Sequence, residues 1–171
     1  GDSPYQSYSA FAGNPLFIDL QELCKEGLLK KGRCKRTPWG EDLSYVDYDV
    51  VRAGRERVLR KAFDNFTDTK SLERFRKRNK AWVEDYALYM AIKSQMDGQP
   101  WTEWEKGLRL RDPEGLKNWK SRCQKDVDYH VFTQYLFFRQ WEALKKYANE
   151  KGVKIIGDAP IYVAMDSADV W

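Results

Sequence analysis

The carboxylate whose position most favours chemistry is Asp158, which follows the segment VKII at residues 153–156 and Gly157. The segment is β-branched and comes directly after a long helical pattern, so it predicts a buried parallel strand fed by a helix. In α/β folds, binding and catalytic groups gather at the carboxyl ends of parallel strands. The equally supported alternative is that Asp158 caps the turn before Pro160.

A second stretch with chemical character opens the chain, SPYQSYSAFAGNP at residues 3–15. Ser3, Tyr5 and Gln6 bring hydroxyl, aromatic and amide groups together, and the Gly-Asn-Pro triplet at residues 13–15 predicts a turn. Aromatic residues make up 15% of the chain, which leaves some for stacking platforms after the core is filled. Sugars and nucleic-acid bases both use such platforms. The stretch therefore predicts a rigid binding loop.

Residues suited to metal or nucleophilic chemistry are sparse. Cys24, Cys34 and Cys123 form no CxxC pair, which argues against a disulfide framework and against a zinc site and suits a reducing cytoplasm. The only histidine, His130, lies in an aromatic helical pattern, where a packed side chain is the expected role. We expect no metal site.

The length and composition of the chain limit the classes of protein to which it can belong. The chain has 171 residues, of which 33% are charged, and a formal net charge of +4. Its mean hydropathy is −0.76. This length allows one compact domain with a core. No run of about 18 apolar residues predicts a membrane span, and no basic segment followed by an apolar one marks a secretory signal. We expect a soluble, cytoplasmic protein.

Helical periodicity dominates the region between the two stretches. Helices are expected at residues 18–29, 47–66, 71–79, 81–96, 101–108, from 113 onward and 126–149, with a connection at residues 30–40.

Helix ends and one helix face can also be predicted. Thr69 or Ser71 is a candidate N-cap, and Asp112 with Pro113 forms an N-cap followed by a first-turn proline. Gly152 stands where a helix-ending glycine belongs. One face of the last helix is apolar, formed by Phe137, Trp141, Leu144 and Ala148.

The two ends of the chain together resemble a known family. The motifs SPYQSYSAFAGNPLFIDL and GDAPIYVAMDSADVW, with AWVEDYALYMAIK and FRQWEALKKYANEKG between them, are similar to those of amylomaltases, the 4-α-glucanotransferases of glycoside hydrolase family 77. The end motifs are specific and lie about 150 residues apart, in the family's order. Ala159 departs from the pattern, since a larger apolar residue is usual there, and we interpret it as a packing change.

The resemblance implies an α/β fold, namely a fragment of a (β/α)8 TIM barrel. The chain would be mostly the α-helical insertion between barrel strands 2 and 3, plus strand 3. Residues 1–20 would form the substrate-binding loop after strand 2, residues 21–125 the helical insertion, and residues 126–171 a barrel helix, strand 3 and the following loop. Because such a barrel takes about 250 residues, we expect an internal fragment. The family's nucleophile, acid/base and stabilising aspartate would lie beyond Trp171, so we expect no catalytic residue here.

The resemblance also implies roles in sugar binding. Tyr5 matches the tyrosine that stacks on the ring next to the cleaved bond, and Asp158 matches an aspartate near the same subsite. Ser3 and Gln6 are expected partners of sugar hydroxyls. Trp171 is expected to shape the pocket wall.

The remaining expectations concern Asp166 and the partners. Asp166 either shapes the same wall or caps the next helix. The implied partners are maltooligosaccharides and α-1,4-glucans, without a cofactor, a nucleic acid or a membrane.

Two other functions compete with this one. From Arg52 to Lys80 there are eleven Lys or Arg against four Asp or Glu, which fits either a helix that binds nucleic acid or a solvated helical face. A stand-alone carbohydrate-binding module would explain the aromatic residues, but it would not explain the helix-strand unit at the end of the chain.

Overall fold

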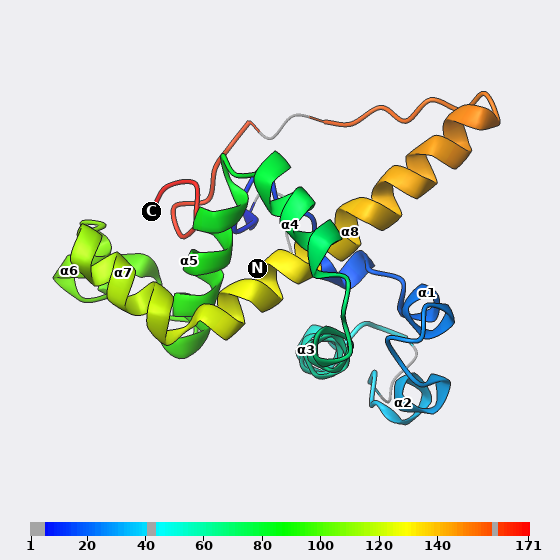
Figure 1. The fold of residues 1–171 in the computed structure, drawn as a ribbon, viewed down its shortest axis with the longest axis horizontal. Coiled ribbons are helices and arrows are strands. Elements are labelled where there is room, and N and C mark those ends of the chain that lie inside the picture. Colours follow the sequence, from blue (N-terminus) through cyan, green and yellow to red (C-terminus); the bar gives the residue numbers. More distant parts are fainter. Residues whose placement is uncertain (1–5, 41–43, 159–160) are drawn as a thin grey trace.

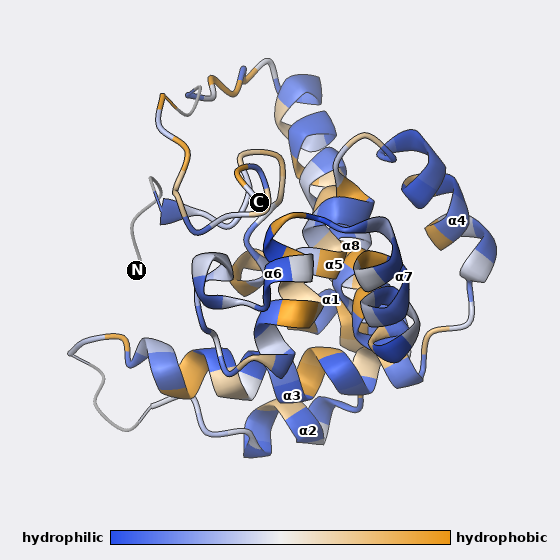
Figure 2. Cartoon of the chain, turned by 90° about the vertical axis from the view of Figure 1, so that its left-hand side faces the viewer, coloured by the Kyte–Doolittle hydropathy of each residue, from blue (hydrophilic) through white to orange (hydrophobic). Residues whose placement is uncertain are grey.

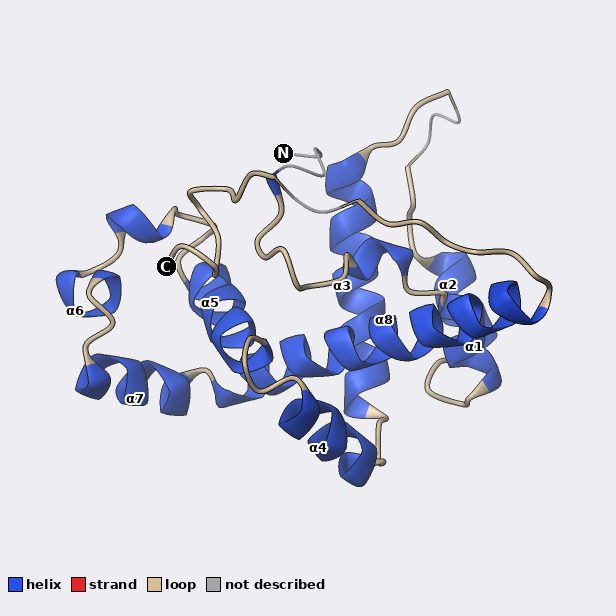
Figure 3. Ribbon diagram, turned by 90° about the horizontal axis from the view of Figure 1, so that it is seen from above, coloured by secondary structure: helices blue, strands red, loops and turns tan. Residues whose placement is uncertain are grey.

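The computed structural model describes residues 6–40, 44–158 and 161–171, and in this part of the chain every regular element is a helix (Figure 3). The short 3₁₀ helices are η2 (Pro15–Phe17) and η3 (Trp101–Glu103). The α-helices are α1 (Leu20–Lys25), α2 (Lys31–Arg36), α3 (Tyr48–Asp64), α4 (Thr69–Arg78), α5 (Val83–Gln95), α6 (Lys106–Arg109), α7 (Pro113–Arg122) and α8 (Gln124–Glu150). The helical character expected from the periodicity is confirmed.

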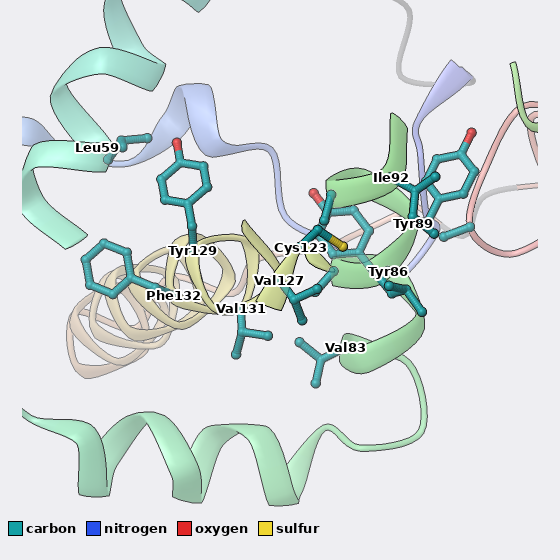
Figure 4. Packing of buried hydrophobic residues seen from close by; sticks show 14 of the residues in the cluster. Leu59, Val83, Tyr86, Tyr89, Ile92, Cys123, Val127, Tyr129, Val131 and Phe132 are labelled. Carbon is teal, nitrogen blue, oxygen red and sulfur yellow. The ribbon is translucent and has the colours of Figure 1, made fainter. Parts of the chain in front are cut away.

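Helix α8 organises the molecule. It runs diagonally across the view, and the segment that follows it returns toward α5, where the chain ends (Figure 1). The most extensive helix contact among the described elements joins α5 to α8, and α3 and α4 also pack on α8. Val83 of α5 and Val127 and Val131 of α8 are fully buried in this contact (Figure 4). Each such side chain stabilises the fold by roughly 1.5–3 kcal/mol, so the α5–α8 pair is the frame that holds the loops.

Several predicted helix ends are confirmed. The carboxylate of Asp112 accepts a hydrogen bond from the Gly115 amide, and Pro113 opens α7. At the end of α8, Gly152 has φ of +75°, a conformation that favours glycine. The amide of Val153 then donates to the Ala148 carbonyl, which closes the helix.

Two local predictions are wrong. Helix α4 is capped by Asp68, whose carboxylate accepts from the Ser71 amide at 3.1 Å, and not by Thr69 or Ser71. Residues 30–40 are not only a connection, because residues 31–36 form α2. The indole of Trp39 and the hydroxyl of Thr37 donate to carbonyls of the last turn of α2, and these local caps stabilise the helix end despite a sequence rich in turn formers.

The strand predicted at residues 153–156 is a correction to the expected α/β unit. These residues form no ladder and are exposed, with Ile156 94% exposed. A β-branched run becomes a strand only when a neighbouring strand pairs with its backbone. No such partner occurs among the described residues, so the α/β class is not seen in this chain.

The C-terminal half of α8 also departs from expectation. Its apolar face continues past Phe137, but Trp141 and Leu144 are exposed, by 36% and 55% respectively. The segment after α8 adds further exposed apolar residues, visible as orange patches along the chain that follows the helix (Figure 2). The periodicity located the face correctly, yet nothing in the described part of the chain covers its outer half.

Candidate functional site

The structure brings the two specific motifs into direct contact. The amide of Ala168 donates to the carbonyl of Tyr8 at 2.8 Å. The Asp169 carboxylate accepts from the Ser9 hydroxyl at 2.7 Å and from the Ala10 amide at 2.6 Å. Ser9 is only 3% exposed. Segments about 160 residues apart therefore form one unit, held by charge-assisted hydrogen bonds.

A second aspartate attaches this unit to the helices. Asp166 accepts from the Tyr89 hydroxyl at 2.5 Å and from the Lys93 ammonium at 2.6 Å, both from α5. The amide of Trp101 also donates to it, at 3.3 Å. Burial alone would raise the pKa of Asp166, but these three donors outweigh it and lower the pKa. Asp166 is thus a structural anchor between the C-terminal loop and α5, and its expected place in a pocket wall stays a prediction.

Lys93 is the buried centre of this anchor. Lys93 is 5% exposed. Its ammonium donates to Asp166 and also to the carbonyls of Gly98 and Gln99. The ring of Tyr8 lies 5.4 Å from the same nitrogen. Because a lysine is rarely buried unless it is paired, this set of partners explains why a charge sits inside the apolar stretch YALYMAIK. The lone lysine in that stretch is the signal that could have found it.

Trp171 lies in the core and not on an open face. It is 7% exposed, and its ring packs against Tyr89 and Trp104 with centroids 5.8 and 5.3 Å away. Its indole donates to the carbonyl of Leu108, and Arg111 covers the ring. Trp171 therefore supports the loop from behind, and direct contact with a ligand stays a prediction that this burial disfavours.

The first motif is held by α8 through two glutamines. The side chain of Gln134 accepts from the Gly13 amide at 2.8 Å and donates to the Gly13 carbonyl at 3.0 Å. Gln140 makes the same pair of bonds with Asp19. A side-chain amide thus pairs with the backbone as a neighbouring strand would. Sequence reasoning missed both glutamines, because a polar residue in a helix gives no sign of what it faces.

Gly13 also meets a steric requirement. A Cβ atom at this position would lie 2.0 Å from the ring of Phe137. The backbone passes so close to α8 that only glycine fits, which explains the glycine in the SAFAGNP motif.

Only some of the residues expected to bind a ligand lie in the described part of the chain. Ser3 and Tyr5 lie outside the described residues. Gln6 is described and exposed, and Asp158 lies on the exposed segment after α8. Their contact with a sugar stays a prediction. What the structure does show is that residues 166–169, which begin eight positions after Asp158 in the sequence, touch the first motif.

Three further findings concern the described residues. Within them, no group of three or more His, Cys, Asp or Glu side chains is arranged to hold a metal ion. His130 packs in α8 with a buried Nε2, and burial lowers its pKa to about 4. None of the helices in the described ranges combines the length and apolar character that crossing a bilayer requires.

Comparison with known proteins agrees with the motifs. Residues 1–171 match the protein family described as 4-alpha-glucanotransferase. The chain belongs to this family. Among its relatives, the 4-alpha-glucanotransferase of Clostridium butyricum is 46% identical over 100% of this chain and 36% of its own length. That of Aquifex aeolicus is 46% identical over 100% of this chain and 34% of its own length.

The fold of this 4-alpha-glucanotransferase family member also matches that of solved structures. An amylomaltase from Streptococcus agalactiae in complex with acarbose superposes with a TM-score of 0.94 and 42% identity. The match covers 99% of this chain and 35% of that one. The chain therefore spans about a third of the length of these relatives.

Proposed function

We propose that this chain forms part of the donor-sugar site of a 4-α-glucanotransferase, which transfers α-1,4-glucan segments between maltooligosaccharides. The match of residues 1–171 to the family carries the proposal. The Streptococcus agalactiae amylomaltase in complex with acarbose supports it, since its fold is shared over nearly the whole chain. In this proposal the chain is an internal part of a larger TIM-barrel enzyme, with residues 1–20, 21–125 and 126–171 as loop, helical insertion, and barrel helix with strand and loop.

The proposed reaction is a retaining double displacement. One carboxylate attacks the anomeric carbon, while an acid about 5 Å away protonates the leaving sugar and later deprotonates the acceptor. The rest of the enzyme supplies both groups. Asp166 and Asp169 are unsuited to these roles, because their oxygens already accept hydrogen bonds from Lys93, Tyr89, Ser9 and the Ala10 amide.

In the proposed site this chain binds sugar. The flat ring of Tyr5 would stack on the sugar next to the cleaved bond, and Asp158 would place a negative charge near the cation that develops there. Ser3 and Gln6 would bond to sugar hydroxyls. The contact between residues 8–10 and 166–169 supports this arrangement, because it ties together the two loops that carry Tyr5 and Asp158.

The exposed apolar surface fits the same proposal. The outer half of α8 and the segment after it expose Trp141, Leu144, Ile155, Ile156 and Tyr162. Exposed apolar side chains that gather into a large patch mark an interaction surface. We infer that the barrel covers it in the intact enzyme, where residues 153–156 would pair as strand 3.

The structure offers little support for a nucleic-acid partner. Arg60 contacts Glu56 and the Asp126 carboxylate of α8, and Arg76 reaches Asp128 of α8. Part of the basic run therefore neutralises acidic residues of a neighbouring helix instead of forming a free patch. A shift of labelled single-stranded or duplex DNA that disappears at high salt would revive this alternative.

Incubation with maltotriose tests the proposed function on two samples, the isolated chain and a chimera. The isolated chain should release no glucose and form no longer maltodextrins, because the nucleophile and acid/base lie elsewhere. A chimera in which residues 1–171 replace the matching segment of the Clostridium butyricum relative should form both products. Turnover by the pure chain, or a folded but inactive chimera, would contradict the proposal. Tight binding of maltooligosaccharides by the isolated chain would favour a carbohydrate-binding module.

A further inference from the structure

Two thiols that are ten positions apart in the sequence meet between α1 and α2. The Sγ atoms of Cys24 and Cys34 lie 3.9 Å apart, and both residues are partly exposed and free. The chain between them turns at Gly27, whose φ is +77°. The third cysteine differs, because Cys123 is buried and its thiol donates to the carbonyl of Trp119 at 2.8 Å.

Cys34 is also one of the residues that line an open groove at the protein surface. The groove has a volume of about 570 Å³ and is lined by Cys34, Trp39, Arg55 and residues 16–21 among others. The Trp39 indole donates to the Cys34 carbonyl, and the Arg55 guanidinium lies over the Trp39 ring, 5.9 Å from its centre. Burial raises the pKa of the Cys34 thiol, and the positive charge of Arg55 opposes that rise. The pKa is raised overall, so reaction at Cys34 rests on its partial exposure and on its contact with Cys24, and only the thiolate fraction attacks.

We propose that Cys24 and Cys34 are a reversible thiol–disulfide site that is oxidised by a low-molecular-weight disulfide such as oxidised glutathione. The inference does not depend on the proposed function. A disulfide needs a sulfur separation of about 2.05 Å, so side-chain rotation must bring the two atoms closer by somewhat less than 2 Å. The pair is already in contact, and no other residue separates the two sulfurs.

The reaction balances as two exchange steps. In the first, the thiolate of Cys34 attacks one sulfur of oxidised glutathione, forms a mixed disulfide and expels one glutathione thiolate. In the second, the thiolate of Cys24 attacks the Cys34 sulfur and expels the other. The two protein thiol protons end on the two glutathiones, so glutathione is reduced as the protein dithiol is oxidised. The bond would tie α1 to α2 at the edge of the groove.

Alkylation followed by mass spectrometry tests the proposal on the whole chain. The chain is incubated with oxidised glutathione, free thiols are blocked with N-ethylmaleimide, and tryptic peptides are analysed without reduction. We expect the Cys24 and Cys34 peptides linked to each other, with Cys123 alkylated. The linked form should melt roughly 5–10 °C above the reduced form, and dithiothreitol should reverse both changes.

Three variants sharpen the result. Cys24→Ser should leave a stable glutathione adduct on Cys34, because the resolving thiol is gone. Cys34→Ser should leave Cys24 without the bridge. Cys123→Ser is the matched control and should form the bridge as the parent does. The proposal is overturned if Cys24 and Cys34 stay alkylated under oxidation, if glutathione adducts accumulate in the parent without the bridge, or if Cys123 enters the bonded pair.

Discussion

At the scale of single residues, two aspartates of the C-terminal loop have different structural roles. Asp169 holds the first motif through Ser9 and the Ala10 amide, whereas Asp166 fastens the same loop to α5 through Tyr89 and Lys93. The side chain of Lys93 is 6% exposed and that of Asp166 is 38% exposed. Lys93 is thus a desolvated cation, and Asp166 is a half-exposed anion. Removing the charge of Asp166 would therefore cost stability mainly because the buried charge of Lys93 is left uncompensated.

Asp166→Asn should lower the free energy of unfolding by about 1–3 kcal/mol, less than for a fully buried pair because Asp166 is half exposed. Urea unfolding at neutral pH measures this. Since the pKa of Asp166 is lowered in the folded state, its contribution is full above the ordinary pKa of an aspartate and is lost as the pH falls through the folded-state pKa. The parent and variant should therefore converge in strong acid.

The matched control is Glu22→Gln, which removes the partner of Lys25 in a solvent-exposed pair. We expect a change within about 0.5 kcal/mol. Equal losses for Glu22→Gln and Asp166→Asn would show that burial of Lys93 does not matter.

His130 gives a second prediction at this scale. Burial, aided by the charge of Arg60, lowers its pKa to about 4. The unfolded chain takes up a proton near pH 6.5, the ordinary value for histidine, so stability should fall as the pH drops from about 6.5 to 4. The fall should reach at most about 3 kcal/mol. His130→Gln should flatten this part of the stability profile, and an unchanged slope would contradict the burial of the imidazole.

The residue scale is also where sequence reasoning was weakest. It singled out Asp158 from its place after a β-branched run, and it treated Asp166 as a wall or cap residue. Lys93, Ser9 and Asp169 were missed, because their partners lie in distant parts of the chain. A polar side chain shows its chemical type in the sequence, but its partner is set by the fold.

At the scale of elements, α8 acts both as core and as template. Its first half packs on α5, and two of its glutamines pair with the backbone of the first motif at Gly13 and Asp19. Gln134 is fully buried and Gly13 is partly buried, so water replaces their bonds less readily than at an exposed site. Buried backbone groups that lose their partners cost more than exposed ones.

Gln134→Met keeps the volume of the side chain but leaves the Gly13 amide and carbonyl without partners. We expect a loss of about 1–3 kcal/mol, because an unsatisfied buried group costs about 1–3 kcal/mol and the Gly13 groups are only partly buried. Gln140→Met removes the equivalent bonds at an exposed site, where water can replace them, and should cost less than about 1 kcal/mol. Thermal melts of both variants decide the matter, and a larger loss for Gln140→Met would contradict the template role.

The elements show why helices could be predicted and the strand could not. Caps such as Asp112 and Gly152 act within one turn, so the local sequence is sufficient to place them. A strand at residues 153–156 needs a pairing partner, and the C-terminal end of α2 is capped by Trp39 and Thr37, which lie outside the helix. An element that depends on groups outside it cannot be predicted from the residues of that element alone.

At the scale of the whole molecule, the chain is a helical frame with two tied loops and an exposed apolar flank. The family membership follows from the sequence alone, because both end motifs are specific and in order, and the match over residues 1–171 confirms it. The proposed role of Tyr5 and Asp158 stays a prediction, and the contact between residues 8–10 and 166–169 supports it.

The most direct test of this account uses Tyr5 in the active chimera. Tyr5→Ala removes a stacking surface at the sugar that distorts in the transition state, so it should lower kcat as well as raise KM. A contact of about 1–3 kcal/mol corresponds to a loss in kcat/KM of roughly 5- to 150-fold. Tyr5→Phe keeps the ring and should retain more activity, and Asp158→Asn should be worse than Tyr5→Phe.

The measurement is steady-state disproportionation of maltotriose by the chimera and its three variants, with folding checked by thermal melting. We expect activity to fall in the order parent, Tyr5→Phe, then Asp158→Asn and Tyr5→Ala, at equal melting temperature. A folded Tyr5→Ala chimera whose kcat/KM stays within about twofold of the parent, a change of about 0.4 kcal/mol, would show that the first motif is scaffold and not part of the sugar site.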